Sequence, residues 1–182
     1  YLPKAWRRSR VIFIPKPGKN SYDQARSFRP ITLTNFVVKI LERVLLWEIQ
    51  QKSFSINPLS NDQYAFRPGR CTNSALSVMV GKIEQAIKNK GFTLGVFLDI
   101  QGAFDNVNPD SIILGMRDKG IDETLINWYN FYLRNRSIEV EYKGVKTTRS
   151  LTKWTPQGGV LSPVVWNLAF ESLLEKYRTG PV

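Results

Sequence analysis

The chain has 182 residues, of which 42% are apolar, and this composition suits one folded domain, or two subdomains that share a core, rather than a disordered chain. It contains no histidine and one cysteine, Cys71, which excludes histidine-based catalysis, histidine-ligated zinc, and any disulfide or cysteine zinc site within the chain. The net charge of +11 favours a polyanion such as a nucleic acid or a nucleotide as the partner.

Much of the positive charge lies in residues 1–30, which contain eight Lys and Arg residues against a single acidic residue, Asp23. In this block, the apolar run at 11–14 predicts a β-strand, and residues 15–19 predict a constrained, basic turn. A solvated basic face is the alternative interpretation of the charge. An anionic membrane is a poorer partner, because the block has no clear amphipathic helix and no apolar run approaches the ~20 residues that span a bilayer.

Two helices are predicted in the first half of the chain. Apolar residues at helical spacing predict one helix over 35–51, with Thr34 as its N-cap, and another over 73–89. The segment between them, residues 63–70, contains proline and glycine and is predicted to be irregular. The second helix has five apolar residues on one face, namely Leu76, Met79, Val80, Ile83 and Ile87.

An apolar run at residues 92–99 predicts a buried strand that ends in Asp99. The sheet would fix the backbone of this carboxylate while its side chain stands at the rim, where a metal or a substrate can be bound rigidly. Capping the next helix is the alternative role for such an aspartate. Gly102 and Ala103 favour the functional role, because small residues let the backbone approach phosphates closely.

The rest of the chain mixes helices and strands. Two helices, at about 111–118 and 123–133, each follow an aspartate that we expect to cap them, Asp110 and Asp122. Alternating residues over 137–142 predict a half-exposed strand, and Ser162 followed by proline predicts the start of a final helix. This order predicts an α+β fold rather than a regular βαβ repeat.

A second candidate site is the loop at residues 155–163, which combines Gln157 with two adjacent glycines. Glycines adopt dihedrals that other residues avoid and leave room for a ligand, and Gln157 offers both a hydrogen-bond donor and an acceptor. Alone, such a loop is usually only a turn. Lys16 and Arg29 lie on loops beside the first strand, and phosphates are their most natural partners.

Four motifs in this chain, taken in order, resemble those of reverse transcriptases from non-LTR (LINE-type) retrotransposons. They are residues 14–19 with 28–33, residues 63–70, residues 97–105 and residues 156–163. The first is similar to a fingers motif, the third to the motif with the first catalytic aspartate, and the fourth to the motif that cradles the incoming nucleotide. Each motif is weak alone, but their common order is a strong signal.

The resemblance implies a right-hand polymerase fold, with fingers plus a truncated palm. The fingers would comprise residues 1–90 and 111–155, and the palm would comprise residues 91–110 and 156–182. The implied function is RNA-directed DNA synthesis, in which two Mg²⁺ ions assist nucleotidyl transfer to a primer 3′-OH. Template RNA, a DNA primer and deoxynucleoside triphosphates would be the partners, with no membrane.

The resemblance also implies a role for each site residue. Asp99 would be a catalytic carboxylate and metal ligand, and Ile100 would lend its backbone carbonyl to the metal. The residues in contact with the nucleotide would be Lys16, Arg29, Gly102, Ala103, Phe104, Gln157 and Gly158. Phe104 would lie under the sugar and exclude a 2′-hydroxyl. Arg67 and Arg70 would contact the template–primer duplex.

The remaining metal ligands of the family are paired aspartates beyond the fourth motif, and this chain has no two adjacent aspartates. It also begins with Tyr1 rather than Met. We therefore expect a fragment, itself inactive, of an intracellular enzyme of the host nucleus and cytoplasm. Two alternatives are a group II intron-type reverse transcriptase and a non-catalytic RNA-binding module with a decayed polymerase fold.

Overall fold

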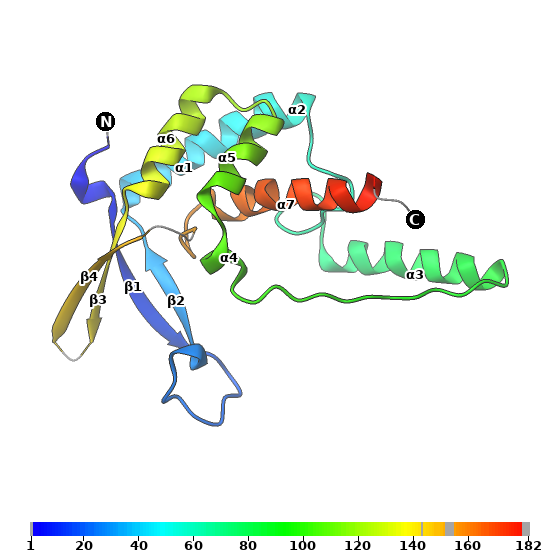
Figure 1. Ribbon diagram of the computed structural model, residues 1–182, viewed down its shortest axis with the longest axis horizontal. Coiled ribbons are helices and arrows are strands. Elements are labelled where there is room, and N and C mark those ends of the chain that lie inside the picture. Colours follow the sequence, from blue (N-terminus) through cyan, green and yellow to red (C-terminus); the bar gives the residue numbers. More distant parts are fainter. Residues whose placement is uncertain (1, 143, 152–154, 180–182) are drawn as a thin grey trace.

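The computed structural model describes residues 2–142, 144–151 and 155–179, which form a four-stranded sheet and a set of helices (Figure 1). The elements in chain order are η1 (Lys4–Trp6), β1 (Arg8–Pro15), η2 (Ala25–Ser27), β2 (Phe28–Leu33), α1 (Phe36–Glu48), η3 (Ile49–Ser53), α2 (Phe54–Ile56), α3 (Thr72–Lys88), α4 (Ala103–Asn106), α5 (Pro109–Asp118), α6 (Glu123–Arg134), β3 (Ser137–Tyr142), β4 (Val145–Ser150) and α7 (Ser162–Thr179). The sheet lies at one end of the molecule and α3 extends from the other, with the remaining long helices between them.

The strands pair in the order β2-β1-β3-β4. β1 is antiparallel to β2 and parallel to β3, and β3 forms an antiparallel hairpin with β4. The parallel pairing joins residues 8–11 to residues 137–140, so two segments far apart in the sequence meet in one sheet. The strands predicted at 11–14 and 137–142 are confirmed, and the first is longer because the polar residues before it pair with β3.

The core lies among α1, α5, α6 and α7, which we call the helical body. Its side chains include Val38, Tyr129 and Leu168, each with 0% of its surface exposed. The close packing of α5 on α7 depends on Gly115, because a Cβ atom there would lie only 2.3 Å from the carbonyl oxygen of Leu168. A glycine inside a helix costs about 1 kcal/mol relative to alanine, and here it permits the contact between the two helices.

The helix predicted over 35–51 is confirmed as α1, and helical backbone continues through η3 and α2 as far as Ile56. Its N-cap is Asn35 rather than the predicted Thr34. The Asn35 side chain accepts a hydrogen bond of 2.9 Å from the backbone N–H of Val37. Thr34 lies one residue too early for this geometry and is instead buried beside the sheet.

The caps of α5 and α6 show how local sequence sets a helix start. Asp122 accepts a hydrogen bond from the backbone N–H of Thr124 and caps α6 as predicted. Asp110 does not cap α5, because Pro109 occupies the first helical position and Asn108 takes the capping role.

The final helix, α7, begins at Ser162 as predicted. Its inner face includes the buried Leu168, so it contributes to the core. None of the helices in the described part of the chain is long and apolar enough to cross a membrane.

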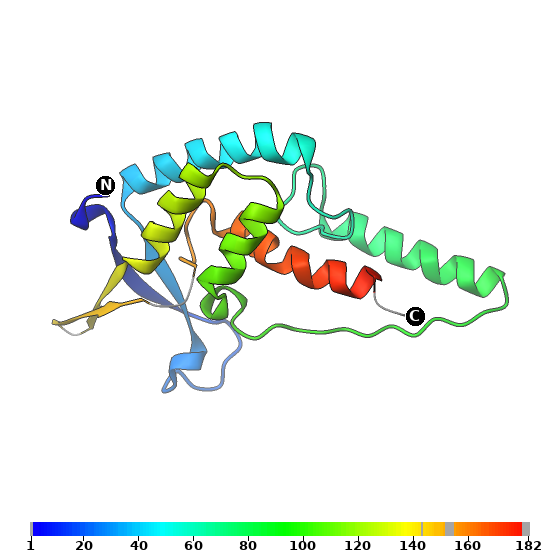
Figure 2. The ribbon, with the colours of Figure 1, turned by 45° about the horizontal axis from the view of Figure 1, so that its top comes forward.

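α3 confirms the helix predicted over 73–89, but its apolar face is not covered. None of its residues is buried, and Leu76 and Ile87 keep 48% and 64% of their surface exposed. The helix extends away from the helical body, and residues 91–100 return along its length (Figure 2).

This return segment corrects the prediction of a buried strand over 92–99. Residues 91–100 are extended but form no ladder with any described strand. Phe92 and Leu98 expose 93% and 85% of their surface. A strand is defined by pairing with a neighbour, and the described residues contain no neighbour for this one.

Candidate nucleotide and nucleic-acid site

The loop of residues 155–161, here called the glycine loop, is bonded to two segments from elsewhere in the chain. The backbone N–H of Thr155 donates to the carbonyl oxygen of Phe104 at 3.0 Å. The carbonyl oxygen of Gln157 accepts from the backbone N–H of Thr32, in β2, at 2.9 Å. The glycine loop is therefore fixed against both the sheet and α4.

The two glycines of this loop are required by the space around them. Gly158 has a φ of +121°, and a Cβ atom there would lie 2.8 Å from the carbonyl oxygen of Thr32. At Gly159 a Cβ atom would lie 2.6 Å from the Ser162 hydroxyl and 2.9 Å from the Pro156 ring. Any larger residue at either position would displace the loop from the sheet or from α7.

Gln157 has a free hydrogen-bonding group at the same place. Its side-chain Oε1 is buried and has no hydrogen-bond partner among the described residues. Buried amide oxygens are usually bonded, so an unbonded one beside a glycine pair can accept a hydrogen bond from a ligand. The role of Gln157 in nucleotide binding stays a prediction.

Phe104 is half-buried beside the glycine loop, between two aromatic rings. Its ring centroid lies 6.2 Å from that of Phe66 and 5.9 Å from that of Trp166. Gly102, just before α4, has a left-handed φ of +63°. Because Phe104 is bonded to Thr155, the structure brings the predicted segments 102–104 and 157–158 close together.

Asp99 and Ile100 lie at the end of the exposed return segment, just before α4. Both are exposed, and no partner of the Asp99 carboxylate is seen among the described residues. Within the described ranges, no three His, Cys, Asp or Glu side chains gather closely enough to bind a metal ion. Asp99 therefore lies three residues before segment 102–104 in the sequence, and the described residues place no cluster of further carboxylates around it.

Lys16 and Arg29 lie together at the outer end of the β1–β2 ladder. The backbone N–H of Lys16 donates to Ser27 at 2.9 Å, and its carbonyl oxygen accepts from the Tyr22 hydroxyl at 2.8 Å. Arg29 lies within β2 rather than on the predicted loop, because it pairs across the ladder with Ile14, and it is exposed. The backbone around both residues is fixed, which suits side chains that would contact phosphates.

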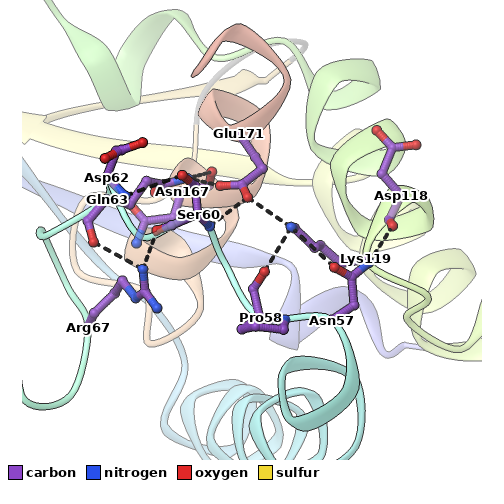
Figure 3. A network of polar contacts seen from close by, with 10 residues as sticks. All are labelled: Asn57, Pro58, Ser60, Asp62, Gln63, Arg67, Asp118, Lys119, Asn167 and Glu171. Carbon is purple, nitrogen blue, oxygen red and sulfur yellow. Dashed lines mark hydrogen bonds and ion pairs between the residues drawn. The ribbon is translucent and has the colours of Figure 1, made fainter. Parts of the chain in front are cut away.

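A buried ion pair anchors the segment that leads into α3 (Figure 3). Lys119 Nζ lies 2.8 Å from Glu171 Oε1, and the two side chains are 7% and 6% exposed. Lys119 also donates to the carbonyl oxygen of Pro58 at 2.9 Å. Glu171 accepts from the backbone N–H of Ser60 at 2.7 Å and from the Gln63 side chain. These contacts, the buried polar network, tie the segment to α5 and α7.

Arg67 extends this network, as Figure 3 shows. Its guanidinium donates to the carbonyl oxygens of Ser60 and Gln63, and burial lowers its pKa. Arg70 lies over the Tyr64 ring at 4.9 Å. The two predicted nucleic-acid-binding arginines are thus on one fixed segment, and Arg67 also stabilises that segment.

Sequence reasoning missed Glu42, which contacts the glycine loop from α1. Its side chain is wholly buried, and its Oε2 accepts a hydrogen bond of 2.7 Å from the backbone N–H of Val160. A signal was present, because Val38 lies four residues before Glu42 and Leu45 three residues after it, on the inner face of the helix. The partners of Lys119 and Glu171 had no comparable signal, since they come from distant elements.

A model of a known protein family matches nearly the whole chain. The family model described as "Reverse transcriptase (RNA-dependent DNA polymerase)" matches residues 14–181. The RNA-directed DNA polymerase from mobile element jockey of Drosophila melanogaster is 30% identical over 169 residues, which cover 92% of this chain and 18% of that protein. The Pol polyprotein from the type-1 retrotransposable element R2 of Popillia japonica is 27% identical over 185 residues, covering 100% and 25%.

Among solved structures, the chain is similar to apo telomerase from Candida tropicalis, truncated from its C-terminal domain. The TM-score is 0.66 at 14% identity, and the match covers 97% of this chain and 40% of that chain. At this identity the likeness shows the fold. The chain spans about a fifth of the length of the jockey relative.

Proposed function

Because the chain belongs to the reverse transcriptase (RNA-dependent DNA polymerase) family, we propose that it forms the fingers and part of the palm of a longer polymerase. The family is one of nucleotidyltransferases, and the relatives are polymerases of retrotransposons of the non-LTR kind, as the four motifs predict. In the whole protein the activity would be DNA synthesis on template RNA from a DNA primer. The fingers would be residues 1–90 and 111–155, with 91–110 and 156–182 in the palm.

One observation carries the proposal, namely the hydrogen bond from Thr155 to Phe104 that brings the two nucleotide segments together. Between them the deoxynucleoside triphosphate would find the backbone of Gly102 and Ala103 for its phosphates. Gln157 would accept a hydrogen bond from the nucleotide, and the close packing of Gly158 on the sheet would keep that amide in place.

Phosphoryl transfer requires charge neutralisation and alignment more than proton-shuttling side chains, and a chain without histidine can supply both. Lys16 and Arg29 would neutralise phosphate charge. The Asp99 carboxylate and the Ile100 carbonyl are hard oxygen ligands of the type that Mg²⁺ prefers, and both residues are exposed. When bound, Mg²⁺ would stabilise the charge that develops on the transferred phosphoryl group. Asp99 and Ile100 would be only part of a two-ion site.

The template–primer duplex would lie along the basic surface of the chain, where the net charge of +11 favours phosphate contacts. Arg67 and Arg70 would contact it from the segment anchored by the buried polar network. This anchoring favours a defined register, because a guanidinium on a fixed segment loses less freedom on binding.

The test is primer extension by the whole protein on poly(A)–oligo(dT) with Mg²⁺. Asp99→Asn is expected to lower the rate by about 100-fold or more while template–primer binding, measured by fluorescence anisotropy, stays within twofold. The matched control is Asp118→Asn, at an exposed aspartate on the last residue of α5. Full extension by Asp99→Asn would refute the role of Asp99. Binding without extension by the unmodified protein would favour the RNA-binding module instead.

A further inference from the structure

Glu42 is an ionisable side chain in a place where packing alone would favour a leucine. It is 0% exposed, in the middle of α1, on the face that packs against the core. One carboxylate oxygen accepts the N–H of Val160 at 2.7 Å, and the other, Oε1, has no hydrogen-bond partner among the described residues. Burying a carboxylate is costly, so its presence needs a reason beyond filling space.

The surroundings of Glu42 partly offset that cost. The charges of Arg136 and Lys39 stabilise the carboxylate, as do the backbone N–H groups of Val160 and Leu161. The Tyr129 hydroxyl is buried and has no hydrogen-bond partner among the described residues. Burial raises the pKa of Tyr129, and the nearby charge of Glu42 raises it further. The hydrogen bond of 2.7 Å that Glu42 accepts is with the backbone of the glycine loop.

This contact completes a pair of anchors around the two glycines. On one side, Thr32 donates to the carbonyl oxygen of Gln157 at 2.9 Å. On the other side, Glu42 accepts from Val160 at 2.7 Å. Between the anchors lie Gly158 and Gly159, and glycine loses more backbone conformational freedom on folding than any other residue. A Cβ atom at Gly159 would lie 3.3 Å from Glu42 Oε1, so the carboxylate also lies directly against the loop.

We propose that Glu42 is a positioning residue for nucleotide binding, which keeps Gln157 and Gly158 in place by anchoring the far side of the glycine pair through Val160. The inference rests on the proposed function and deepens it, since it assigns a residue that acts on the nucleotide pocket without touching substrate. This role requires a side-chain oxygen at position 42 that is far enough from the helix backbone to accept the N–H of Val160.

The test compares three variants of the whole protein in primer extension on poly(A)–oligo(dT), with KM and kcat measured for dTTP. Glu42→Asp keeps the charge but is one methylene too short to reach Val160, and its KM is expected to rise about tenfold with kcat within about threefold. Glu42→Gln keeps the length and an acceptor oxygen, so its KM is expected to stay within about threefold of the unmodified protein. The control is Ile126→Val, a core change in α6 that weakens packing away from the loop.

A second readout does not depend on turnover. With a dideoxy-terminated primer, the dTTP concentration that stabilises the protein–primer–template complex is expected to rise about tenfold in Glu42→Asp and to stay unchanged in Glu42→Gln and Ile126→Val. If Glu42→Asp does not fold, amide exchange at Val160 in the unmodified protein and in Glu42→Gln decides the matter. Slow exchange in both supports the anchor, and fast exchange in the unmodified protein refutes it.

The remaining outcomes separate this inference from the proposed function. An active enzyme in which Glu42→Asp retains its KM, or in which Glu42→Asp is normal and Glu42→Gln is impaired, contradicts the positioning role. In those cases Glu42 would serve only the fold or only the local charge. Absence of extension and of dTTP-stabilised complexes in the unmodified protein would instead overturn the proposed function itself.

Discussion

The helical body and the projection, which we define as α3 with residues 91–100, are built from similar apolar patterns and have opposite environments. In the helical body, Val165 and Leu168 of α7 are 0% exposed. In the projection, Leu76 of α3 is 48% exposed and Leu94 of the return segment is 85% exposed. The helices of the body share one core, whereas Figure 2 shows that α3 has only an extended segment running along it.

The difference shows that helical apolar spacing predicts α3 but not its burial, and that an apolar run such as residues 92–99 does not by itself form a strand. α3 has 17 residues, which is long enough to be marginally helical without tertiary support. The return segment has no such local source of stability, because extended backbone gains hydrogen bonds only from a neighbouring strand. Amide exchange is therefore expected to be slowest in α7, faster in α3 and fastest over residues 91–100.

The largest effect predicted concerns activity. Residues 1–182 expressed alone are expected to show no primer extension with Mg²⁺ above background, because the return segment carries Asp99 without a paired strand and the described residues bring no cluster of three metal-binding side chains together. The measurement is incorporation of dTTP on poly(A)–oligo(dT). Robust incorporation would contradict this account of the projection.

A second prediction tests whether the buried polar network anchors the segment that leads into α3. Lys119→Met would leave Glu171 buried without its partner and is expected to lower the free energy of unfolding by about 3–5 kcal/mol. The control is Arg117→Met, two residues before Lys119, which removes an exposed ion pair with Glu123. It is expected to change the free energy of unfolding little. Urea denaturation of both variants gives the comparison. Equal losses would mean that the buried polar network does not anchor the start of the projection.

A third prediction compares the two regions directly. Leu168→Ala removes a fully buried side chain and is expected to cost about 2–5 kcal/mol of stability. Leu76→Ala, on the exposed face of α3, is expected to change stability by less than about 0.5 kcal/mol. Thermal denaturation followed by circular dichroism measures both. A large cost at Leu76 would show that the α3 face is covered in solution.

The fourth prediction concerns Phe104, where the projection meets the body. In the whole protein, Phe104→Val is expected to raise the ratio of kcat/KM for ribonucleotides over deoxynucleotides at least about tenfold, because a smaller side chain admits the 2′-hydroxyl. Its contacts with Phe66 and Trp166 support a purely structural role as well. If both substrates lose activity together with a fall in Tm, Phe104 belongs to the core.

The smallest effect is a pH dependence within the body. Burial raises the pKa of Glu42 above its ordinary value of 4.5, against the opposing charges of Arg136 and Lys39, and Tyr129 and Tyr132 stay neutral beside it. Because the folded protein binds this proton more tightly than the unfolded chain, stability falls as pH rises from about 4.5 through the raised pKa and then levels off.

Glu42→Gln has no proton to lose, so the stability of the unmodified protein relative to this variant is expected to decline over that range. Urea denaturation of the two proteins between about pH 4 and pH 8 gives the difference. If the difference in unfolding free energy between the two proteins does not vary with pH, burial does not raise the pKa of Glu42.

Much of the fold could be predicted because its elements have strong local signals. Helical spacing identified α1 and α3, capping residues identified α6 and α7, and alternation identified β3. The errors lie where a local signal has two possible outcomes. Thr34 and Asn35 are both good caps, and the observed hydrogen bond to Val37 selects Asn35. The run at 92–99 has strand-forming residues, but pairing depends on a neighbour that no local pattern specifies.

The candidate site divides in the same way. Motif order predicted that residues 102–104 and 157–158 would act together, and the contact of Thr155 with Phe104 brings them close. Glu42 escaped prediction because a glutamate in an amphipathic helix is normally solvated, and only the docking of the glycine loop makes it buried. The roles of Asp99, Lys16 and Arg29 in binding remain predictions.

The parallel pairing of β1 with β3 has a consequence for how the chain is made. Arg8 and Glu139, which are bonded across this pair, lie 131 residues apart. At a translation rate of roughly 5–20 residues per second, β3 leaves the ribosome on the order of ten seconds after β1. The β1–β2 hairpin can form at once, but during this interval its open edge and apolar residues such as Val11 have no β3 to cover them. The amount of correctly folded protein in the cell would then depend on how well the exposed edge of β1 is kept from aggregating before β3 is made, rather than on the folding rate.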